Sequence, residues 1–353
     1  MATGGVFVFG ARRVSCRHMP RIAINGFGRI GRNTFKAGFD KPGFDVVAIN
    51  DLTDAKTLAH LLKHDSTYHA WNKDVSFDAK NIIVDGKKFP VVAEKDPTKL
   101  PWKELQVDVV LECTGRFTSE DGAMQHVTAG AKRVIISAPA KGGVVPTHVI
   151  GVNEKGAGKT AKIINNASCT TNCIAPVAAI MHEVFGVKKA MMTTIHSYTA
   201  DQVLQDGPHK DLRRARSAGQ NIIPTTTGAA IATAEVIPEL KGLFDGISIR
   251  VPTPCVSLSD FTFLLKRKTT KEEVNAVLKK ASKTARFKGI MDVTEEELVS
   301  SDFIGNPASS IVDLPFTQIV DGDMAKILAW YDNEWGYSHR LADLAVMVGK
   351  VAK

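Results

Sequence analysis

Short apolar runs that alternate with helical patterns dominate the first half of the chain. The run at 21–25 has the length and composition of a buried strand, and a glycine-rich turn and a helical pattern through Phe35 follow it. Further strand-like runs lie at 44–49, 108–113 and 133–137. Strands that alternate with helices predict an α/β fold with a doubly wound parallel sheet.

The pattern changes after Cys169. Strand-like runs at 189–195, 246–251, 257–265 and 326–331 are longer and alternate less regularly with helices. This pattern of longer strands and fewer intervening helices is typical of an α+β arrangement. We therefore expect a second domain, built on a mostly antiparallel sheet, that carries the substrate site.

The last predicted element is an amphipathic helix over 336–351, because apolar residues recur there at helical spacing. The predicted organisation is a first domain over 19–168, completed by the C-terminal helix 334–353, and a catalytic domain over 169–333.

Residues 1–18 differ from the rest of the chain. They contain three arginines and no acidic residue, and their apolar run is too short for a secretory signal. Three interpretations of this segment remain open: translation that starts upstream of Met19, an N-terminal extension, or a weak organelle-targeting peptide. The cytoplasm is the default expectation for the location of the protein. No stretch of eighteen apolar residues predicts a membrane span.

The composition narrows the class of protein. A chain of 353 residues with 44% hydrophobic and 23% charged residues fits a globular protein of about two domains. Five cysteines without paired metal-ligand spacing favour a reducing compartment and predict no metal site. The net charge of +8 suits small anionic substrates as well as nucleic acid. Because no nucleic-acid-binding motif accompanies the charge, nucleic acid is not expected as the primary partner.

A glycine-rich motif follows the first strand and opens the first helix. Such glycines let a pyrophosphate approach backbone N–H groups at a helix N-terminus. The alternative interpretation is that the glycines only form a loop between a strand and a helix. Asp51 ends the second strand, where a carboxylate accepts hydrogen bonds from ribose hydroxyls and repels a 2′-phosphate. The pattern predicts a Rossmann-type NAD site formed by Gly26, Phe27, Gly28, Arg29, Ile30, Gly31 and Asp51.

Cys169 is the candidate nucleophile. It precedes an apolar helical run at 174–185, so it falls near a helix N-terminus, where partial positive charge and an imidazolium would lower the pKa of a thiol. His196 ends a strand-like run and is the candidate base. Taken alone, an isolated cysteine is more often a core residue.

Five strings of the chain are specific to one enzyme family: 167–173, 196–199, 224–230, 250–254 and 330–337. Through them, the chain from residue 20 onward resembles phosphorylating glyceraldehyde-3-phosphate dehydrogenases. The resemblance implies that Cys169 attacks the aldehyde of D-glyceraldehyde 3-phosphate, with His196 as base, and that phosphate cleaves the resulting thioester to 1,3-bisphosphoglycerate. It also implies NAD as the cofactor and a role in glycolysis and gluconeogenesis.

The resemblance also assigns residues to two anion pockets. An arginine within an apolar strand such as 247–251 independently favours an anionic partner, whereas the arginines at 213–216 would otherwise be assigned to a solvated loop. The substrate-phosphate pocket is matched by Thr199 and Arg250, the inorganic-phosphate pocket by Ser168, Thr170, Thr227 and Gly228, and the arginine shared between them by Arg214.

Two further expectations come from the resemblance. Asn333 matches the residue that holds the nicotinamide carboxamide, although an asparagine at this position also suits a turn. The loop 200–219 resembles the segment that packs against a neighbour's cofactor site, so the family implies a homotetramer.

Two alternatives stay open. Erythrose-4-phosphate dehydrogenase shares the cysteine motif and releases a free acid, but Thr199 and the run 225–228 follow the phosphorylating pattern. A non-catalytic NAD- or RNA-binding scaffold would not need both Cys169 and His196.

Overall fold

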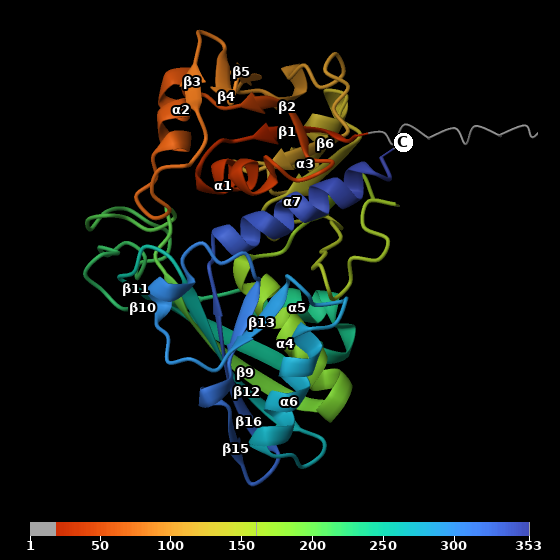
Figure 1. Ribbon diagram of the computed structural model, residues 1–353, viewed down its shortest axis with the longest axis vertical. Helices are drawn as coiled ribbons and strands as arrows, with labels where there is room; N and C mark the ends of the chain where they lie inside the picture. The colour runs from red at the N-terminus through yellow and green to blue at the C-terminus, as the bar shows by residue number, and fades with distance from the viewer. Residues whose placement is uncertain (1–18, 160, 353) are drawn as a thin grey trace, which may run out of the picture.

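Two eight-stranded sheets organise the protein. The computed structural model describes residues 19–159 and 161–352, and Figure 1 shows the two sheets in separate halves of the molecule. The expected α/β fold, with one parallel-rich sheet and one mostly antiparallel sheet, is confirmed. The extension predicted over 1–18 lies outside the described residues.

The first sheet is parallel from β5 to β8 and carries an antiparallel hairpin at one edge. The sequence predicted the parallel strands at 21–25, 44–49, 108–113 and 133–137 but not the hairpin. The strand order is β3 (Val75–Phe77), β4 (Asn81–Val84), β5 (Lys87–Val92), β2 (Asp45–Asn50), β1 (Arg21–Asn25), β6 (Val109–Glu112), β7 (Arg133–Ile136) and β8 (Ile163–Asn165).

Helices cover both faces of this sheet because its strands are apolar on both sides. The face of Ile22 and Ile24 packs in one core with α1 (Arg29–Gly38) and the C-terminal helix α7 (Trp335–Gly349). The opposite face, with Ala23, packs with α3 (Glu120–Thr128). Helix α2 (Ala55–Lys63) contacts the hairpin. A short 3-10 helix, η1 (Pro97–Lys99), contacts α3.

The second sheet is antiparallel except for the pairs β9–β11 and β13–β14. Three 3-10 helices join its elements: η2 (Pro238–Leu240), η3 (Ser300–Phe303) and η4 (Leu314–Phe316). The strand order is β10 (Ile223–Thr226), β11 (Phe244–Val251), β9 (Val187–Ser197), β12 (Ser257–Leu265), β16 (Met324–Tyr331), β14 (Ser310–Asp313) and β13 (Met291–Thr294), with β15 (Gln318–Val320) beside β16.

Three helices lie on one face of this sheet (Figure 1): α4 (Cys169–Phe185), α5 (Ala229–Val236) and α6 (Lys271–Ser282). On the strands, buried and more exposed residues alternate, so the three helices cover one face only. Among the described residues, η3 covers part of the other face, where the ring of Phe303 stacks on Trp330 at 5.3 Å.

The first residue of α4 lies where the two halves meet. Cys169 packs against the core of the first sheet and against the core of the second. A side chain at this junction can face groups from both sheets. Among the described residues, no helix is both long and apolar enough to cross a membrane.

Candidate active site

Helix α4 begins with a capped and strained segment. Ser168 accepts a hydrogen bond at Oγ from the N–H of Thr171 at 2.9 Å, which satisfies one free amide of the first turn. Ala167 has a φ of +55°, a left-handed conformation that is uncommon outside glycine. Tyr337 of α7 donates to the Ala167 carbonyl at 3.1 Å and so helps to hold this turn. The cap and the turn fix Cys169 at the helix N-terminus.

Cys169 and His196 face each other across the site. The Sγ of Cys169 lies 3.5 Å from Nε2 of His196, which is near the end of β9. The Nδ1 atom of His196 lies 2.6 Å from the carbonyl oxygen of Ser197. Because a carbonyl only accepts, Nδ1 carries the proton and Nε2 of the neutral ring is left to accept from the thiol. The predicted nucleophile and base are therefore brought together with the base correctly oriented.

The thiol pKa of Cys169 differs from the sequence-based expectation. Burial raises the pKa of the Cys169 thiol, although the positive charge of Arg250 and hydrogen bonding by Thr170 act in the opposite direction. Burial and Arg250 lower the pKa of His196 to about 3. The expected lowering of the thiol pKa is wrong, because burial disfavours the charged thiolate and is the largest influence on this group. In this environment, burial favours the neutral thiol and the neutral imidazole over the charged forms.

Arg250 is the cation with the largest electrostatic effect on Cys169 and His196. Strands β9 and β11 run parallel in this register, so Arg250 sits directly opposite His196. Its Nη1 atom donates to Thr199 Oγ1 at 3.1 Å and to the Ser197 carbonyl at 3.3 Å, while the buried Nε atom has no partner. No carboxylate among the described residues forms an ion pair with this guanidinium. A buried cation with spare donors is suited to an anionic ligand.

The other predicted arginine is already paired. Arg214 donates from Nη1 to Asp201 at 2.6 Å, and its Nε atom lies 3.5 Å from Asp211. The same Nε donates to Thr225 at 3.0 Å. A second anion at Arg214 would therefore compete with carboxylates, whereas Arg250 has no such competitor.

The residues matched to the inorganic-phosphate pocket occupy two helix N-termini. Ser168 and Thr170 lie at the start of α4, while Thr227 and Gly228 precede α5, for which Gly228 is the N-cap. The hydroxyl of Thr170 is buried 2.9 Å from the hydroxyl of Tyr331, so it faces the sheet core as well. Helix N-termini favour anions through unpaired N–H groups.

The three glycines of the dinucleotide motif have separate structural reasons. Gly26 has a φ of +90°, and a Cβ there would lie 2.8 Å from the backbone nitrogen of Thr114. A Cβ at Gly31 would lie 2.1 Å from the Gly26 carbonyl oxygen, so this glycine permits close packing of helix and turn. A Cβ at Gly28 would meet nothing within 4 Å, so open space lies against the backbone at the N-cap of α1. This cradle fits a pyrophosphate.

The remaining motif residues contribute backbone rather than side chains. The ring of Phe27 is fully buried, and its N–H donates to Asp51 at 2.7 Å. The guanidinium of Arg29 forms ion pairs with Asp65 and Glu334. The side chain of Arg29 is therefore not free for a cofactor, and any contact from it would come from its N–H.

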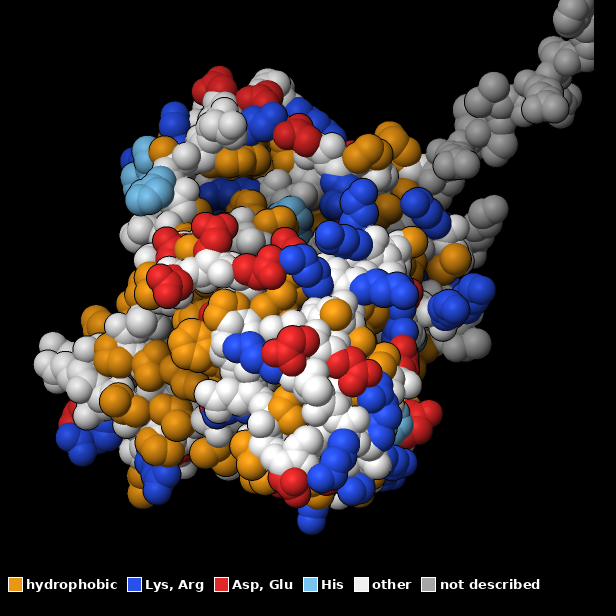
Figure 2. Space-filling model, turned by 60° about the horizontal axis from the view of Figure 1, so that its bottom comes forward, with side chains coloured by type: hydrophobic (Ala, Val, Ile, Leu, Met, Phe, Trp, Pro, Cys, Tyr) orange, Lys and Arg blue, Asp and Glu red, His pale blue; other side chains and the backbone are white. Residues whose placement is uncertain are grey.

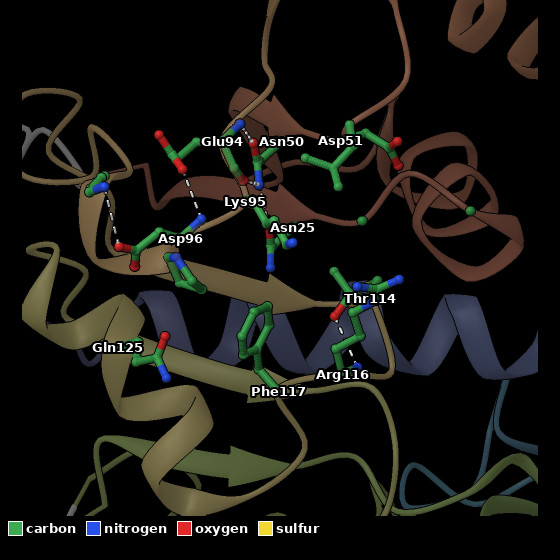
Figure 3. Close-up of a pocket in the computed structure, with 16 residues that line it drawn as sticks. Asn25, Asn50, Asp51, Glu94, Lys95, Asp96, Thr114, Arg116, Phe117 and Gln125 are labelled. Carbon is green, nitrogen blue, oxygen red and sulfur yellow. Dashed lines mark hydrogen bonds and ion pairs between the residues drawn. The ribbon is translucent and has the colours of Figure 1, made fainter.

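A pocket of about 940 Å³ extends from this motif along the carboxyl ends of the first sheet. Figure 3 shows Asn25, Asn50 and Asp51 on one side of it, and Phe117 and Gln125 on the other. Sequence reasoning found Asp51 and the glycines but missed most of the lining. Several of the missed residues could have been found from their place in the sequence, at or just after the ends of predicted strands. The carboxyl ends of parallel strands meet at one edge of a sheet, where such residues can share a pocket. The missed residues include Asn25, Asn50, Glu94, Lys95, Pro97, Thr114, Arg116, Phe117 and Gln125.

Asn333 follows β16 and is 5% exposed. Its Oδ1 atom accepts a hydrogen bond from the hydroxyl of Ser257 at 3.0 Å. The residue is thus held by β12, on the strand next to His196.

Comparison with known proteins agrees with this geometry. Residues 20–120 match the model of the glyceraldehyde 3-phosphate dehydrogenase NAD binding domain, and residues 168–333 match that of its C-terminal domain. The chain belongs to the glyceraldehyde-3-phosphate dehydrogenase family. The predicted family, the NAD cofactor and the enzyme class, an NAD-dependent oxidoreductase, are confirmed.

Individual members of the family are similar over almost their whole length. The glyceraldehyde-3-phosphate dehydrogenase of Geobacillus stearothermophilus is 54% identical over 329 residues, which are 93% of this chain and 98% of the relative. That of Borreliella burgdorferi is 54% identical over 331 residues, covering 92% and 98%. That of Zymomonas mobilis is 52% identical over 332 residues, covering 94% and 98%.

Proposed function

We propose that the protein oxidises D-glyceraldehyde 3-phosphate with NAD and inorganic phosphate, giving 1,3-bisphosphoglycerate in glycolysis and gluconeogenesis. The observation that carries the proposal is the 3.5 Å contact between the Cys169 sulfur and the unprotonated Nε2 of His196. Arg250, with its unpartnered Nε, lies directly beside this pair.

The neutral pair suits covalent chemistry on an aldehyde. Cys169 passes its proton to Nε2 of His196 as the sulfur bonds to the aldehyde carbon, and the imidazolium protonates the oxygen to give a thiohemiacetal. His196 then takes the hydroxyl proton back as the carbon is oxidised to a thioester on Cys169. Attack by phosphate on the thioester carbon releases the acyl phosphate and frees the cysteine sulfur, which recovers the proton from His196.

NAD, when bound, supplies the hydride acceptor. The residues proposed to hold it are the backbone at Gly26–Gly31, with Asp51 at the ribose hydroxyls and Asn333 at the carboxamide. The open space at Gly28 and the free acceptor capacity of Asp51 in the pocket support this assignment.

The two anion pockets would position the reactants. Thr199 and Arg250 are proposed to bind the substrate phosphate, since Arg250 has a donor to spare and no carboxylate partner. Inorganic phosphate is proposed to bind at the N-termini of α4 and α5, held by Ser168, Thr170, Thr227 and Gly228. Arg214 is assigned between the two pockets, where phosphate would have to share it with Asp201.

A homotetramer is proposed from the exposed part of the second sheet, on the face that α4, α5 and α6 do not cover. That face carries apolar side chains, among them Met191 at 61% and Ile247 at 48% exposure. Figure 2 shows hydrophobic side chains gathered in one area of the molecular surface. The loop 200–219 adds exposed Leu204 and Leu212. Large exposed apolar patches mark association surfaces.

Three further assignments complete the proposal. The NAD-binding domain comprises 19–168 together with 334–353, and the catalytic domain comprises 169–333. The cytoplasm is the proposed location, and small anions rather than nucleic acid are the proposed partners.

The reaction is tested by following NADH formation from glyceraldehyde 3-phosphate. The design compares NAD with NADP, phosphate with no phosphate, and wild type with Cys169→Ser. Sustained turnover that needs NAD, phosphate and Cys169 supports the proposal. Turnover without phosphate would instead favour the hydrolytic erythrose-4-phosphate dehydrogenase reaction, and NAD binding without turnover would favour a non-catalytic scaffold.

A further inference from the structure

The amide of Asn333 is held in one orientation by a serine that no motif identifies. Asn333 is almost fully buried, and its Oδ1 atom accepts from Ser257 Oγ at 3.0 Å. Among the residues that the structure describes, none accepts a hydrogen bond from the Nδ2 atom of Asn333. The NH₂ group is therefore the part of this side chain that is available to a ligand.

The orientation follows from the single proton of the Ser257 hydroxyl. The N–H of Ser197 donates to Ser257 Oγ at 3.1 Å, so one lone pair of that oxygen is occupied. The hydroxyl proton then points to Asn333 Oδ1. If the amide were flipped, its NH₂ would point to Ser257 and the hydroxyl proton would lose the only acceptor that the described residues offer it. The pair Ser197–Ser257 therefore selects the orientation with NH₂ outward.

Ser197, which donates to Ser257, also forms hydrogen bonds with the candidate base and with the arginine of the substrate-phosphate pocket. The Ser197 carbonyl accepts from His196 Nδ1 and from Arg250 Nη1. The Ser197 hydroxyl donates to the carbonyl of Val256 at 2.6 Å. Val256 has a φ of +68°, a strained conformation for a β-branched residue, and directly precedes Ser257. The strained turn is held by these contacts, and it places Ser257 against Asn333.

We propose that Ser257 is a positioning residue that presents the Asn333 NH₂ group to the carboxamide oxygen of the nicotinamide. The inference rests on the proposed role of Asn333 in cofactor binding. Ser257 acts through Asn333 and touches no reacting atom, so its effect should appear in recognition of the nicotinamide half of NAD only.

The test measures dissociation constants for NAD and for ADP-ribose, which lacks the nicotinamide. Four proteins form a double-mutant cycle: wild type, Ser257→Ala, Asn333→Ala and the double variant. Ser259→Ala is the matched control, since it removes another fully buried hydroxyl from the same strand. If Ser257→Ala does not fold, Ser257→Cys replaces it, because a thiol is nearly isosteric but a weak donor.

We expect Ser257→Ala to weaken NAD binding about fivefold, as for one lost hydrogen bond, with little change for ADP-ribose. In the Asn333→Ala background the substitution should have no further effect. An equal loss for NAD and ADP-ribose, a full effect in the Asn333→Ala background, or unchanged NAD binding would each overturn the inference. Because binding is measured without turnover, failure of the proposed reaction would appear separately, as NAD binding without phosphate-dependent oxidation.

Discussion

At the residue scale, the reactivity of Cys169 depends on its thiol pKa, which burial and a neighbouring guanidinium shift in opposite directions. Burial raises the pKa of the thiol, whereas the guanidinium of Arg250 lowers it. The same two influences both lower the pKa of His196. Arg250 therefore favours the thiolate of Cys169 and disfavours the imidazolium of His196. Removal of its charge should raise the pKa of both groups.

Arg250→Gln should move the pH profile of Cys169 alkylation to higher pH. Without the positive charge, the thiol pKa rises, so less thiolate exists at any pH below it and alkylation by iodoacetamide slows. Loss of a charge-assisted hydrogen bond should also raise KM for glyceraldehyde 3-phosphate about 10- to 100-fold. The exposed Arg213→Gln makes the same change in net charge and serves as the control. A profile that stays in place or moves to lower pH would contradict this view of the site.

Asp51→Asn should relax the discrimination between NAD and NADP. The asparagine oxygen can still accept from the N–H of Phe27, but the charge that repels a 2′-phosphate is gone. We expect the ratio of NADP to NAD affinity to rise about 5- to 10-fold, measured by titration of both cofactors. Asp54→Asn, three residues away on an exposed helix cap, should leave the ratio unchanged. The assignment of Asp51 fails if both variants behave alike.

Sequence reasoning at this scale found residues that belong to motifs and missed those that act through others. Cys169 and His196 could be predicted because each lies at an element end in a specific string. Their 3.5 Å separation could not, since it depends on how α4 packs on the second sheet. Ser257 gave no signal, because a serine at the start of an apolar strand has many uses. The direction of the thiol pKa shift was mispredicted because burial cannot be read from helix position alone.

At the element scale, α4 does more than carry Cys169. Its N-terminus presents free amides to the site, and Ser168 satisfies one of them as the cap. The cap and the proposed phosphate pocket thus use the same turn, and substitutions at Ser168 can separate the two roles.

Ser168→Ala should lower the free energy of unfolding by about 1 kcal/mol, because the first turn of α4 loses its cap. Ser168→Asp should keep the cap and the stability but place a negative charge in the proposed phosphate pocket, raising KM for inorganic phosphate more than about tenfold. Denaturant unfolding and phosphate titration measure the two effects. Thr270→Ala, which removes the cap of α6, should reproduce only the stability loss. An unchanged KM for phosphate in Ser168→Asp would remove Ser168 from the pocket.

Elements with strong periodicity were predicted closely. The strand expected over 257–265 is β12, and the closing helix expected over 336–351 is α7 over Trp335–Gly349. The hairpin β3–β4 was missed because its strands are short, and the neighbouring β5 contains a proline among lysines. Short elements like these are stabilised by packing against α2 rather than by their own pattern.

At the scale of the whole molecule, the site depends on two cores that meet at Cys169. The helix α7 returns the end of the chain to the first sheet, so Asn333 is fixed between β16 and a helix of the other half. This closure could be expected from the final amphipathic pattern, but the contact of Tyr337 with the strained Ala167 turn could not. Long-range contacts of single side chains leave no periodic trace in the sequence.

Met191→Asp should disrupt the proposed tetramer. Met191 is exposed on the face of the second sheet that α4, α5 and α6 do not cover, and a buried carboxylate at an apolar interface is costly. Analytical ultracentrifugation should show a shift from tetramer to smaller species, while Val144→Asp, at a more exposed loop position in the other half, should not shift it. A monomeric wild type, or a tetramer unaffected by Met191→Asp, would rule out this face as the interface.

The central claim is that the substrate becomes bonded to Cys169 as a thioester that phosphate then cleaves. It is tested most directly by intact-mass and peptide mass spectrometry after a single turnover with NAD and glyceraldehyde 3-phosphate in phosphate-free buffer. We predict one phosphoglyceroyl group per chain, located on Cys169, formed together with one equivalent of NADH and lost on addition of phosphate. NADH formation with no adduct, or an adduct on Cys113, Cys173 or Cys255 instead, would contradict the mechanism.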